Sequence, residues 1–155
     1  MTINYKQEDL FKVESYYAHC ISRDFKMMKG IALQFNHKFD MKNKLKELVK
    51  VQPEQFNSKC ILRDYTFNLI TKNYYYQKPN LDSLKISLEQ FKEQLVNMNI
   101  NYIRIPLIGC GLDKLSWKDV EKLLHQIFDD TPIIFDVCYL EKEKWKVRDF
   151  VGSKN

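Results

Sequence analysis

The stretch that decides the fold runs from Tyr102 to Trp117 and reads Tyr-Ile-Arg-Ile-Pro-Leu-Ile-Gly-Cys-Gly-Leu-Asp-Lys-Leu-Ser-Trp. It holds two of the four glycines of the chain. In its first part Ile103 and Ile105 alternate with Arg104. This alternation predicts a strand that ends near Pro106, because proline cannot donate a hydrogen bond to a central ladder.

A helix is predicted directly after this strand and its glycine loop. Ser116, with Asp119 three positions later, predicts a capping box. The residues that follow form an apolar stripe at helical spacing, namely Val120, Leu123, Leu124 and Ile127. The order is therefore strand, glycine loop, helix.

The loop itself has the composition of an anion site. Gly109 and Gly111 can adopt positive φ, which lets backbone N–H groups approach an anion, and a following helix N-terminus favours negative charge. We therefore expect a phosphate or diphosphate to bind here. The alternative is a tight turn without a ligand.

The composition limits the class of protein. A chain of 155 residues forms one ordinary domain. Its 25 basic and 20 acidic residues leave a net charge of +5. This charge suits anionic ligands, nucleotides or nucleic acid, although a solvated surface explains it equally well. No basic run is interleaved with aromatic residues, so nucleic-acid binding is not the expected primary role.

The cysteines and histidines indicate neither disulfides nor a metal site. The four cysteines are far apart in the sequence, no Cys-x-x-Cys pair occurs, and the N-terminus has no secretion signal. Reduced thiols in a soluble cytoplasmic protein are expected, with no metal and no cofactor. No apolar run is long enough to cross a membrane.

Strand-like and helix-like segments are interleaved along the chain. Strands are expected at 3–6, 16–21, 60–62, 65–71, 102–106 and 133–140, and helices at 27–39, 42–50, 81–98 and after Ser116. Strands 60–62 and 65–71 suggest a hairpin joined at Arg63 and Asp64. This order predicts an α/β domain of three layers, with helices on both faces of a mixed, mostly parallel sheet. We expect the domain to span 1–140 and a charged extension, a tail or short helix, to span 141–155.

Four separate segments resemble those of one family. The chain is similar to a macro domain of the terminal ADP-ribose protein glycohydrolase and O-acyl-ADP-ribose deacylase type. The resemblance covers residues 5 to about 140. Its matching pieces are Tyr5 with Asp9-Leu10-Phe11, then Ala18-His19-Cys20-Ile21-Ser22 with Gly30-Ile31-Ala32, then Leu69-Ile70-Thr71-Lys72, and finally Ile108-Gly109-Cys110-Gly111-Leu112-Asp113.

The resemblance implies an ADP-ribose site in a crevice at the carboxyl ends of the strands, where general α/β reasoning also places ligands. It assigns Asp9 to the adenine amino group, whereas the sequence alone also allows Asp9 to cap a helix. The full set of implied binding residues is Asp9, Leu10, Ser22, Gly30, Ile31, Ala32, Leu107, Ile108, Gly109, Cys110, Gly111, Leu112 and Leu140.

The resemblance assigns catalysis to Lys72 and Asp113. An amine must lose its proton before it attacks the anomeric carbon of the distal ribose, and the product would be a transient lysyl adduct. Asp113 could take a proton from a ribose hydroxyl or protonate the leaving carboxylate. Without the resemblance, Lys72 reads as a surface charge and Asp113 as a helix cap.

The chain departs from the family pattern at several positions. Met28 and Lys29 replace a glycine and a small residue before Gly30, which puts turnover in doubt. Glu8 replaces a glycine, and Leu107 stands where an arginine can occur. The tyrosines 74–76 could form a lid or a stacking wall, or pack against the 81–98 helix.

Cys20 and Cys110 are candidates for a reactive thiol. His19 and Cys20 cannot pair, because adjacent strand residues point to opposite faces. A helix N-terminus would lower the thiol pKa of Cys110, although a loop residue whose backbone binds the ligand is the simpler interpretation.

The expected function is hydrolysis of mono-ADP-ribose esters on glutamate or aspartate, together with deacylation of O-acyl-ADP-ribose. The expected partners are ADP-ribose and ADP-ribosylated protein, and the expected state is a monomer. The alternatives are a non-catalytic ADP-ribose-binding module, an ADP-ribose 1″-phosphate phosphatase, and a hydrolase of ADP-ribosylated nucleic acid.

Overall fold

The fold was obtained as a computed structural model, which describes residues 1–151. Six strands form one sheet in the order β1-β6-β5-β2-β4-β3. Neighbouring strands run parallel except β3 and β4. The strands are β1 (Thr2–Gln7), β2 (Tyr17–Ser22), β3 (Cys60–Arg63), β4 (Thr66–Lys72), β5 (Tyr102–Ile105) and β6 (Ile134–Tyr139). The expected mixed, mostly parallel sheet is confirmed.

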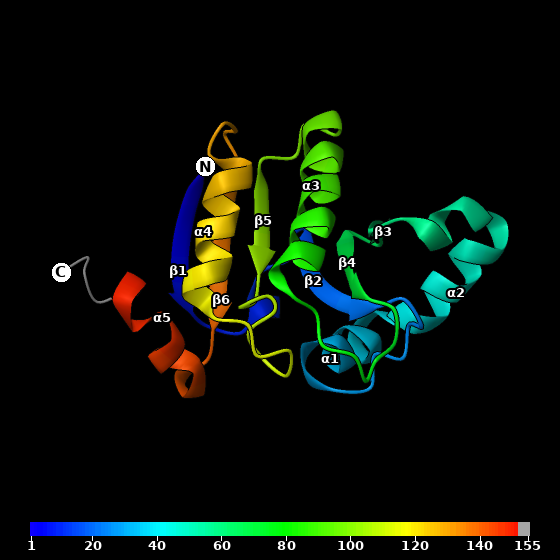
Figure 1. The fold of residues 1–155 in the computed structure, drawn as a ribbon, viewed down its shortest axis with the longest axis horizontal. Coiled ribbons are helices and arrows are strands. Elements are labelled where there is room, and N and C mark those ends of the chain that lie inside the picture. The colour runs from blue at the N-terminus through cyan, green and yellow to red at the C-terminus, as the bar shows by residue number, and fades with distance from the viewer. Residues whose placement is uncertain (152–155) are drawn as a thin grey trace.

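Helices cover both faces of this sheet. They are α1 (Gly30–Phe39), α2 (Met41–Val51), α3 (Leu81–Asn97), α4 (Trp117–Phe128) and α5 (Lys144–Val151), with short 3-10 turns η1 (Leu10–Lys12), η2 (Pro53–Asn57) and η3 (Glu141–Glu143). Figure 1 shows α3 and α4 side by side against one face. The α1 and α2 helices pack on the opposite face, so the three-layer architecture is confirmed.

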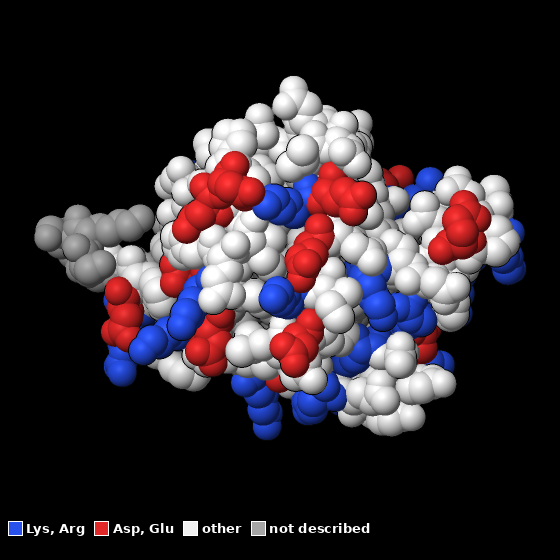
Figure 2. Space-filling model, turned by 45° about the horizontal axis from the view of Figure 1, so that its top comes forward, with Lys and Arg blue, Asp and Glu red and all other residues white. Residues whose placement is uncertain are grey.

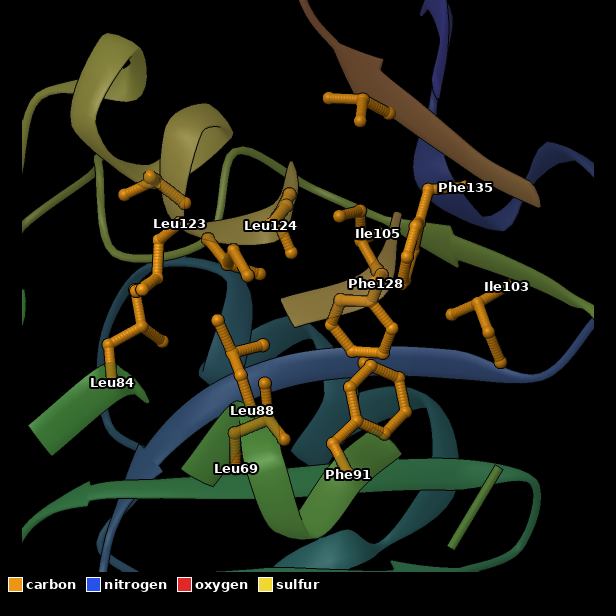
Figure 3. Close-up of a cluster of buried hydrophobic side chains, with 14 of the residues drawn as sticks. Leu69, Leu84, Leu88, Phe91, Ile103, Ile105, Leu123, Leu124, Phe128 and Phe135 are labelled. Atoms are coloured by element: carbon orange, nitrogen blue, oxygen red, sulfur yellow. The ribbon is translucent and has the colours of Figure 1, made fainter. Parts of the chain in front are cut away.

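The α3–α4 face carries the larger part of the core. Figure 3 shows leucines and phenylalanines from the two helices meeting Ile103, Ile105 and Phe135 of the sheet. Fully burying each such side chain contributes roughly 1.5–3 kcal/mol before entropic costs. The helical spacing in the sequence predicted this face because period-3.6 apolar positions must all point toward the same layer. The sheet is therefore a firm support for the loops at its strand ends.

Three local predictions are wrong. The first helix begins at Gly30 instead of Met27, because Met27 has a φ of 49° and cannot lie in a right-handed helix. The β3–β4 hairpin turns at Asp64 and Tyr65, one residue later than expected, and both residues have positive φ, as a tight hairpin turn requires. Ser116 makes no side-chain cap, and its carbonyl accepts the N–H of Asp119 at 3.1 Å instead.

The C-terminal segment contains the α5 helix, which packs beside β1. Val147 is fully buried, and the ring of Phe150 stacks on Tyr5 with 5.8 Å between centroids. Residues 152–155 of the expected extension lie outside the described residues. Within residues 1–151, no helix combines the length and apolar character that crossing a bilayer demands.

Candidate active site

Lys72 and Asp113 meet at the carboxyl end of the sheet. Lys72 is the last residue of β4, and Asp113 belongs to the loop that follows β5. The Lys72 Nζ donates to the Asp113 Oδ1 at 2.9 Å, and the two side chains are 15% and 16% exposed. An ammonium and a carboxylate are thus held together where a small molecule can still reach them.

The glycine loop next to this pair has a fixed shape. Gly109 has a φ of 73°, and a β-carbon there would lie 2.9 Å from the Leu115 Cδ1, so a larger residue would be strained and crowded. Two lysines from other elements also bind the loop. Lys78 donates to the Leu112 carbonyl at 2.8 Å, and Lys146 of α5 donates to the Cys110 carbonyl at 2.8 Å.

Gly111 does not have the expected positive φ; Lys114 has one, at 61°. Helix α4 begins at Trp117, directly after Ser116 as expected, and the N–H of Leu115 just before it donates to the Gly109 carbonyl at 2.8 Å. The loop nevertheless offers donors. Within residues 1–151, the N–H groups of Gly111, Leu112 and Asp113 have no hydrogen-bond acceptor. They remain available to phosphate oxygens.

The N-terminus of α1 lies against this loop. A β-carbon on Gly30 would come within 3.5 Å of the Leu112 Cδ1, so the two loops are in contact. The N–H groups of Gly30, Ile31 and Ala32 form the first helical turn and have no partner within the helix. The structure therefore brings together two sets of backbone donors, a combination suited to a diphosphate.

Met28 lies just before this junction. It has no positive φ, so the missing glycine imposes no backbone strain. Its side chain is 47% exposed. Met27 and Phe25 are the buried residues here, and they take the left-handed conformations.

Asp9 caps the short η1 turn. Its Oδ1 accepts the N–H of Phe11 at 2.7 Å, and the residue is exposed. The capping alternative is thus what the structure shows, and the cap fixes the direction of the carboxylate. Leu10, beside it, is buried.

Arg104 is a supporting residue that the sequence did not single out. Its guanidinium is 1% exposed and donates to the carbonyls of Leu10 and Asp9 at 3.0 and 3.1 Å, and to the Glu8 Oε2 at 2.7 Å. The hydrogen bond from Arg104 lowers the pKa of Glu8. Glu8, which replaces the expected glycine, therefore helps to hold the Asp9 segment. An arginine inside an otherwise apolar strand was the signal that could have revealed this role.

Ser22 holds the other wall of the site. It is buried, and its Oγ donates to the Asp24 Oδ1 at 2.5 Å. The Asp24 Oδ2 accepts the N–H of Tyr75 at 2.9 Å. Burial raises the pKa of Asp24, but the hydrogen bonds from Ser22, Tyr75 and Lys26 outweigh it and lower the pKa overall.

The tyrosines that follow Lys72 do not pack against α3. Tyr74, Tyr75 and Tyr76 are 52%, 49% and 67% exposed. The rings of Tyr74 and Tyr76 stack on each other with 5.6 Å between centroids. They form an exposed aromatic wall next to the Lys72 strand end.

The thiols here are protonated. Burial raises the pKa of Cys20, with a further contribution from the Asp113 carboxylate. Burial also raises the pKa of Cys110 to about 12, opposite to the expected lowering. His19 points to the other face of β2, where its Nε2 pairs with the Asn68 Oδ1 at 2.7 Å. Neither cysteine is a ready nucleophile.

The remaining implied residues differ in what they offer. Leu107 and Ile108 are buried in the core, so only their backbone can face a ligand. Leu140 follows β6 and is 42% exposed. Across residues 1–151, no three His, Cys, Asp or Glu side chains form a group that could hold a metal ion.

The sequence matches no family model. It is similar to human ADP-ribose glycohydrolase OARD1, with 37% identity over 143 residues that cover 89% of this chain and 91% of the human protein. Among solved structures, the macrodomain of Mycobacterium tuberculosis DarG superposes with a TM-score of 0.72 at 25% identity, covering 90% of this chain and 97% of the other. That of Thermus aquaticus DarG gives 0.75 at 17% identity, covering 89% and 97%.

These similarities cover about nine-tenths of the chain. A relative 37% identical over 91% of its own length is sufficient to establish kinship. This chain belongs to the macro-domain family of ADP-ribose glycohydrolases.

Proposed function

We propose that this chain hydrolyses the ester between ADP-ribose and a glutamate or aspartate side chain, and that it also deacylates O-acyl-ADP-ribose. The observation that carries the proposal is the Lys72–Asp113 pair, 2.9 Å apart, beside two sets of unpaired backbone donors. The human relative is named for glycohydrolysis of ADP-ribose, which supports the same reaction class here.

The two sets of donors support one position for the ligand. The N–H groups of Gly111, Leu112 and Asp113 face a diphosphate from one side, and the first turn of α1 faces it from the other. The adenosine then extends toward Asp9, and the distal ribose toward Lys72. The Leu112 side chain is 56% exposed and lies over Gly30, so it moves aside as the diphosphate enters.

The pair then supplies both a base and a nucleophile. Asp113 accepts a proton from the Lys72 ammonium, and the neutral amine attacks C1″ of the ribose. The C1″–N bond forms as the C1″–O bond breaks, and its electron pair leaves with the glutamate carboxylate. Ring opening gives a protonated Schiff base with the ring oxygen as a hydroxyl. Water then attacks C1″ and releases ADP-ribose, which restores the lysine.

The test uses a peptide that carries one ADP-ribose on a glutamate ester. We expect ADP-ribose to be released by the wild-type protein and by Lys122→Ala, which removes an exposed lysine from α4. Calorimetric titration with free ADP-ribose is run on the same preparation. Binding without release would leave a non-catalytic binding module, and absence of both would overturn the proposal.

A second candidate is release of ADP-ribose from nucleic acid. The exposed rings of Tyr74 and Tyr76, with Arg23 over the Phe56 ring at 5.6 Å, combine stacking surfaces with a cation. A Mycobacterium tuberculosis relative, 26% identical over 73% of this chain but only 34% of its own length, is named a DNA ADP-ribosyl glycohydrolase. Faster release from a modified single-stranded oligonucleotide than from the ester peptide would favour this candidate.

A further inference from the structure

A cavity adjoins Lys72. Its volume is about 490 Å³, and it lies between the end of β4, the start of β3 and the N-terminus of α3. Three lysines line it, Lys59, Lys72 and Lys78, and no acidic residue does. Figure 2 shows basic side chains gathered in the region between α3 and α2, whereas basic and acidic ones alternate over α3 and α4.

Two further features of this cavity favour an anion. Thr71 is 4% exposed and lines the cavity, and its Oγ1 has no hydrogen-bond partner in the described part of the chain. A buried hydroxyl without a partner costs free energy, so its retention here points to a partner that arrives with a ligand. The N-terminus of α3 borders the same space through Asn80 and Ser83, which adds the positive end of a 17-residue helix.

Lys59 is the lysine of this cavity whose ammonium group is available to bind an anion. Its Nζ makes no ion pair or hydrogen bond within residues 1–151, whereas Lys72 pairs with Asp113 and Lys78 donates to the Leu112 carbonyl. An unpaired ammonium, an unpaired hydroxyl and a helix N-terminus thus surround one space. The ammonium and the hydroxyl lack an acceptor within residues 1–151, and an oxyanion would satisfy both. The N-terminus of α3 is capped by Asn80, so it contributes only the positive end of its dipole.

We propose that this cavity binds the carboxylate of an acidic residue that neighbours the modified side chain of a target polypeptide. This inference rests on the proposed ester hydrolysis, because Lys72 connects the cavity to the reacting sugar. A side-chain carboxylate fits better than a nucleic-acid strand, since the cavity is concave and contains no aromatic ring on which a base could stack. The site therefore selects targets with clustered acidic residues.

The test compares two peptides, each carrying one ADP-ribose on a glutamate ester. One has glutamates beside the modified residue and the other has glutamines. The wild-type protein should hydrolyse the acidic peptide with a kcat/KM about five- to tenfold higher. Lys59→Ala should reduce this ratio to about one, and Thr71→Val to an intermediate value. The control Lys122→Ala should keep the wild-type ratio.

Three outcomes would overturn the proposal. The first is equal hydrolysis of the two peptides by the wild-type protein, which defeats the subsite while leaving ester hydrolysis standing. The second is an equal loss of selectivity in Lys122→Ala, which would reveal a general charge effect. The third concerns inhibition of ester hydrolysis by added competitors. A single-stranded oligonucleotide that inhibits more strongly than the unmodified acidic peptide, in a way that depends on Lys59, would contradict the proposal. If neither peptide is hydrolysed, the proposed function itself fails, and with it the inference.

Discussion

Two pairs of opposite charges mark the two halves of the sheet, and they are built differently. On the β1–β6–β5 half, buried Arg104 lies near Asp136 and holds Glu8. On the β2–β4 half, Lys72 has Asp113 as its one side-chain partner within residues 1–151. Arg104 and Asp136 each have several hydrogen-bond partners, whereas one hydrogen bond joins Lys72 to Asp113.

The difference extends to the surrounding groups. Asp136 accepts hydrogen bonds from Asn4 and Tyr102 and an ion pair from Lys6 at 3.3 Å. Burial alone would raise the pKa of Asp136, but these hydrogen bonds lower it overall. Arg104 has a raised pKa, because its hydrogen bonds to Glu8 and Tyr102 outweigh burial. A network of several hydrogen bonds stabilises one arrangement.

The comparison teaches which charges shape the site and which react in it. A cluster with several hydrogen bonds fixes the Glu8–Leu10 segment. A pair with one bond can exchange its proton and its partner during a reaction.

The largest effect is expected from Lys72→Ala. Removing the nucleophile should reduce ester hydrolysis by about 10⁴-fold, or about 5.5 kcal/mol in the barrier. Folding stability should fall by only about 1 kcal/mol, because the pair is a single ion pair near the surface. Release assays and urea unfolding check the two parts. Full turnover in the variant would remove Lys72 from the mechanism.

Arg104→Met should reduce folding stability much more than Lys72→Ala does. Breaking a buried charge cluster leaves Glu8 and Asp136 uncompensated, so the free energy of unfolding should fall by about 3–5 kcal/mol. The matched control is Lys6→Met, which removes a half-exposed partner of Asp136 and should cost under about 1 kcal/mol. Equal losses in the two variants, measured by urea unfolding, would show that the cluster is not a structural support.

His19 gives the fold a dependence on pH. Its ring is fully buried against Phe35, and burial lowers its pKa to about 4 from an ordinary value of 6.5. A lowered folded-state pKa means that the stabilisation is complete above about pH 6.5 and is lost as the pH falls toward 4. The loss amounts to about 3 kcal/mol.

Urea unfolding at pH 7.5 and 4.5 measures this effect. The wild-type protein should lose more stability between the two values than His19→Gln, whereas replacement of the exposed His37 by glutamine should leave the loss unchanged. Identical pH dependence in wild type and His19→Gln would show that His19 is not the titrating group.

The smallest effect is expected from Asp9→Ala. Loss of an adenine contact and of the η1 cap should weaken ADP-ribose binding about tenfold, or about 1.4 kcal/mol. Calorimetric titration measures the affinity, with Asp149→Ala on exposed α5 as the control. An unchanged affinity would show that the Asp9 carboxylate does not contact the ligand.

The sequence could predict the layers and most of the elements, because apolar spacing determines which face of a helix or strand is buried. The pairing of Lys72 with Asp113 was implied by the family resemblance, because the sequence alone suggests a surface charge and a helix cap. Positive φ at Met27 and Lys114 was not predictable, because tertiary packing imposes these conformations on residues that do not prefer them. The role of Arg104 was missed because its partners, Glu8 and the backbone of Asp9 and Leu10, lie more than ninety positions away.

Reductive trapping tests the central claim most directly. This claim is that the Lys72 amine, which has one hydrogen bond to Asp113, attacks the sugar. The protein is incubated with the ADP-ribosylated ester peptide and sodium cyanoborohydride, and its peptides are analysed by mass spectrometry. We predict an added ADP-ribose on Lys72 in the wild-type protein and none in Lys72→Ala. Rapid release of ADP-ribose with no adduct on Lys72 would contradict the account.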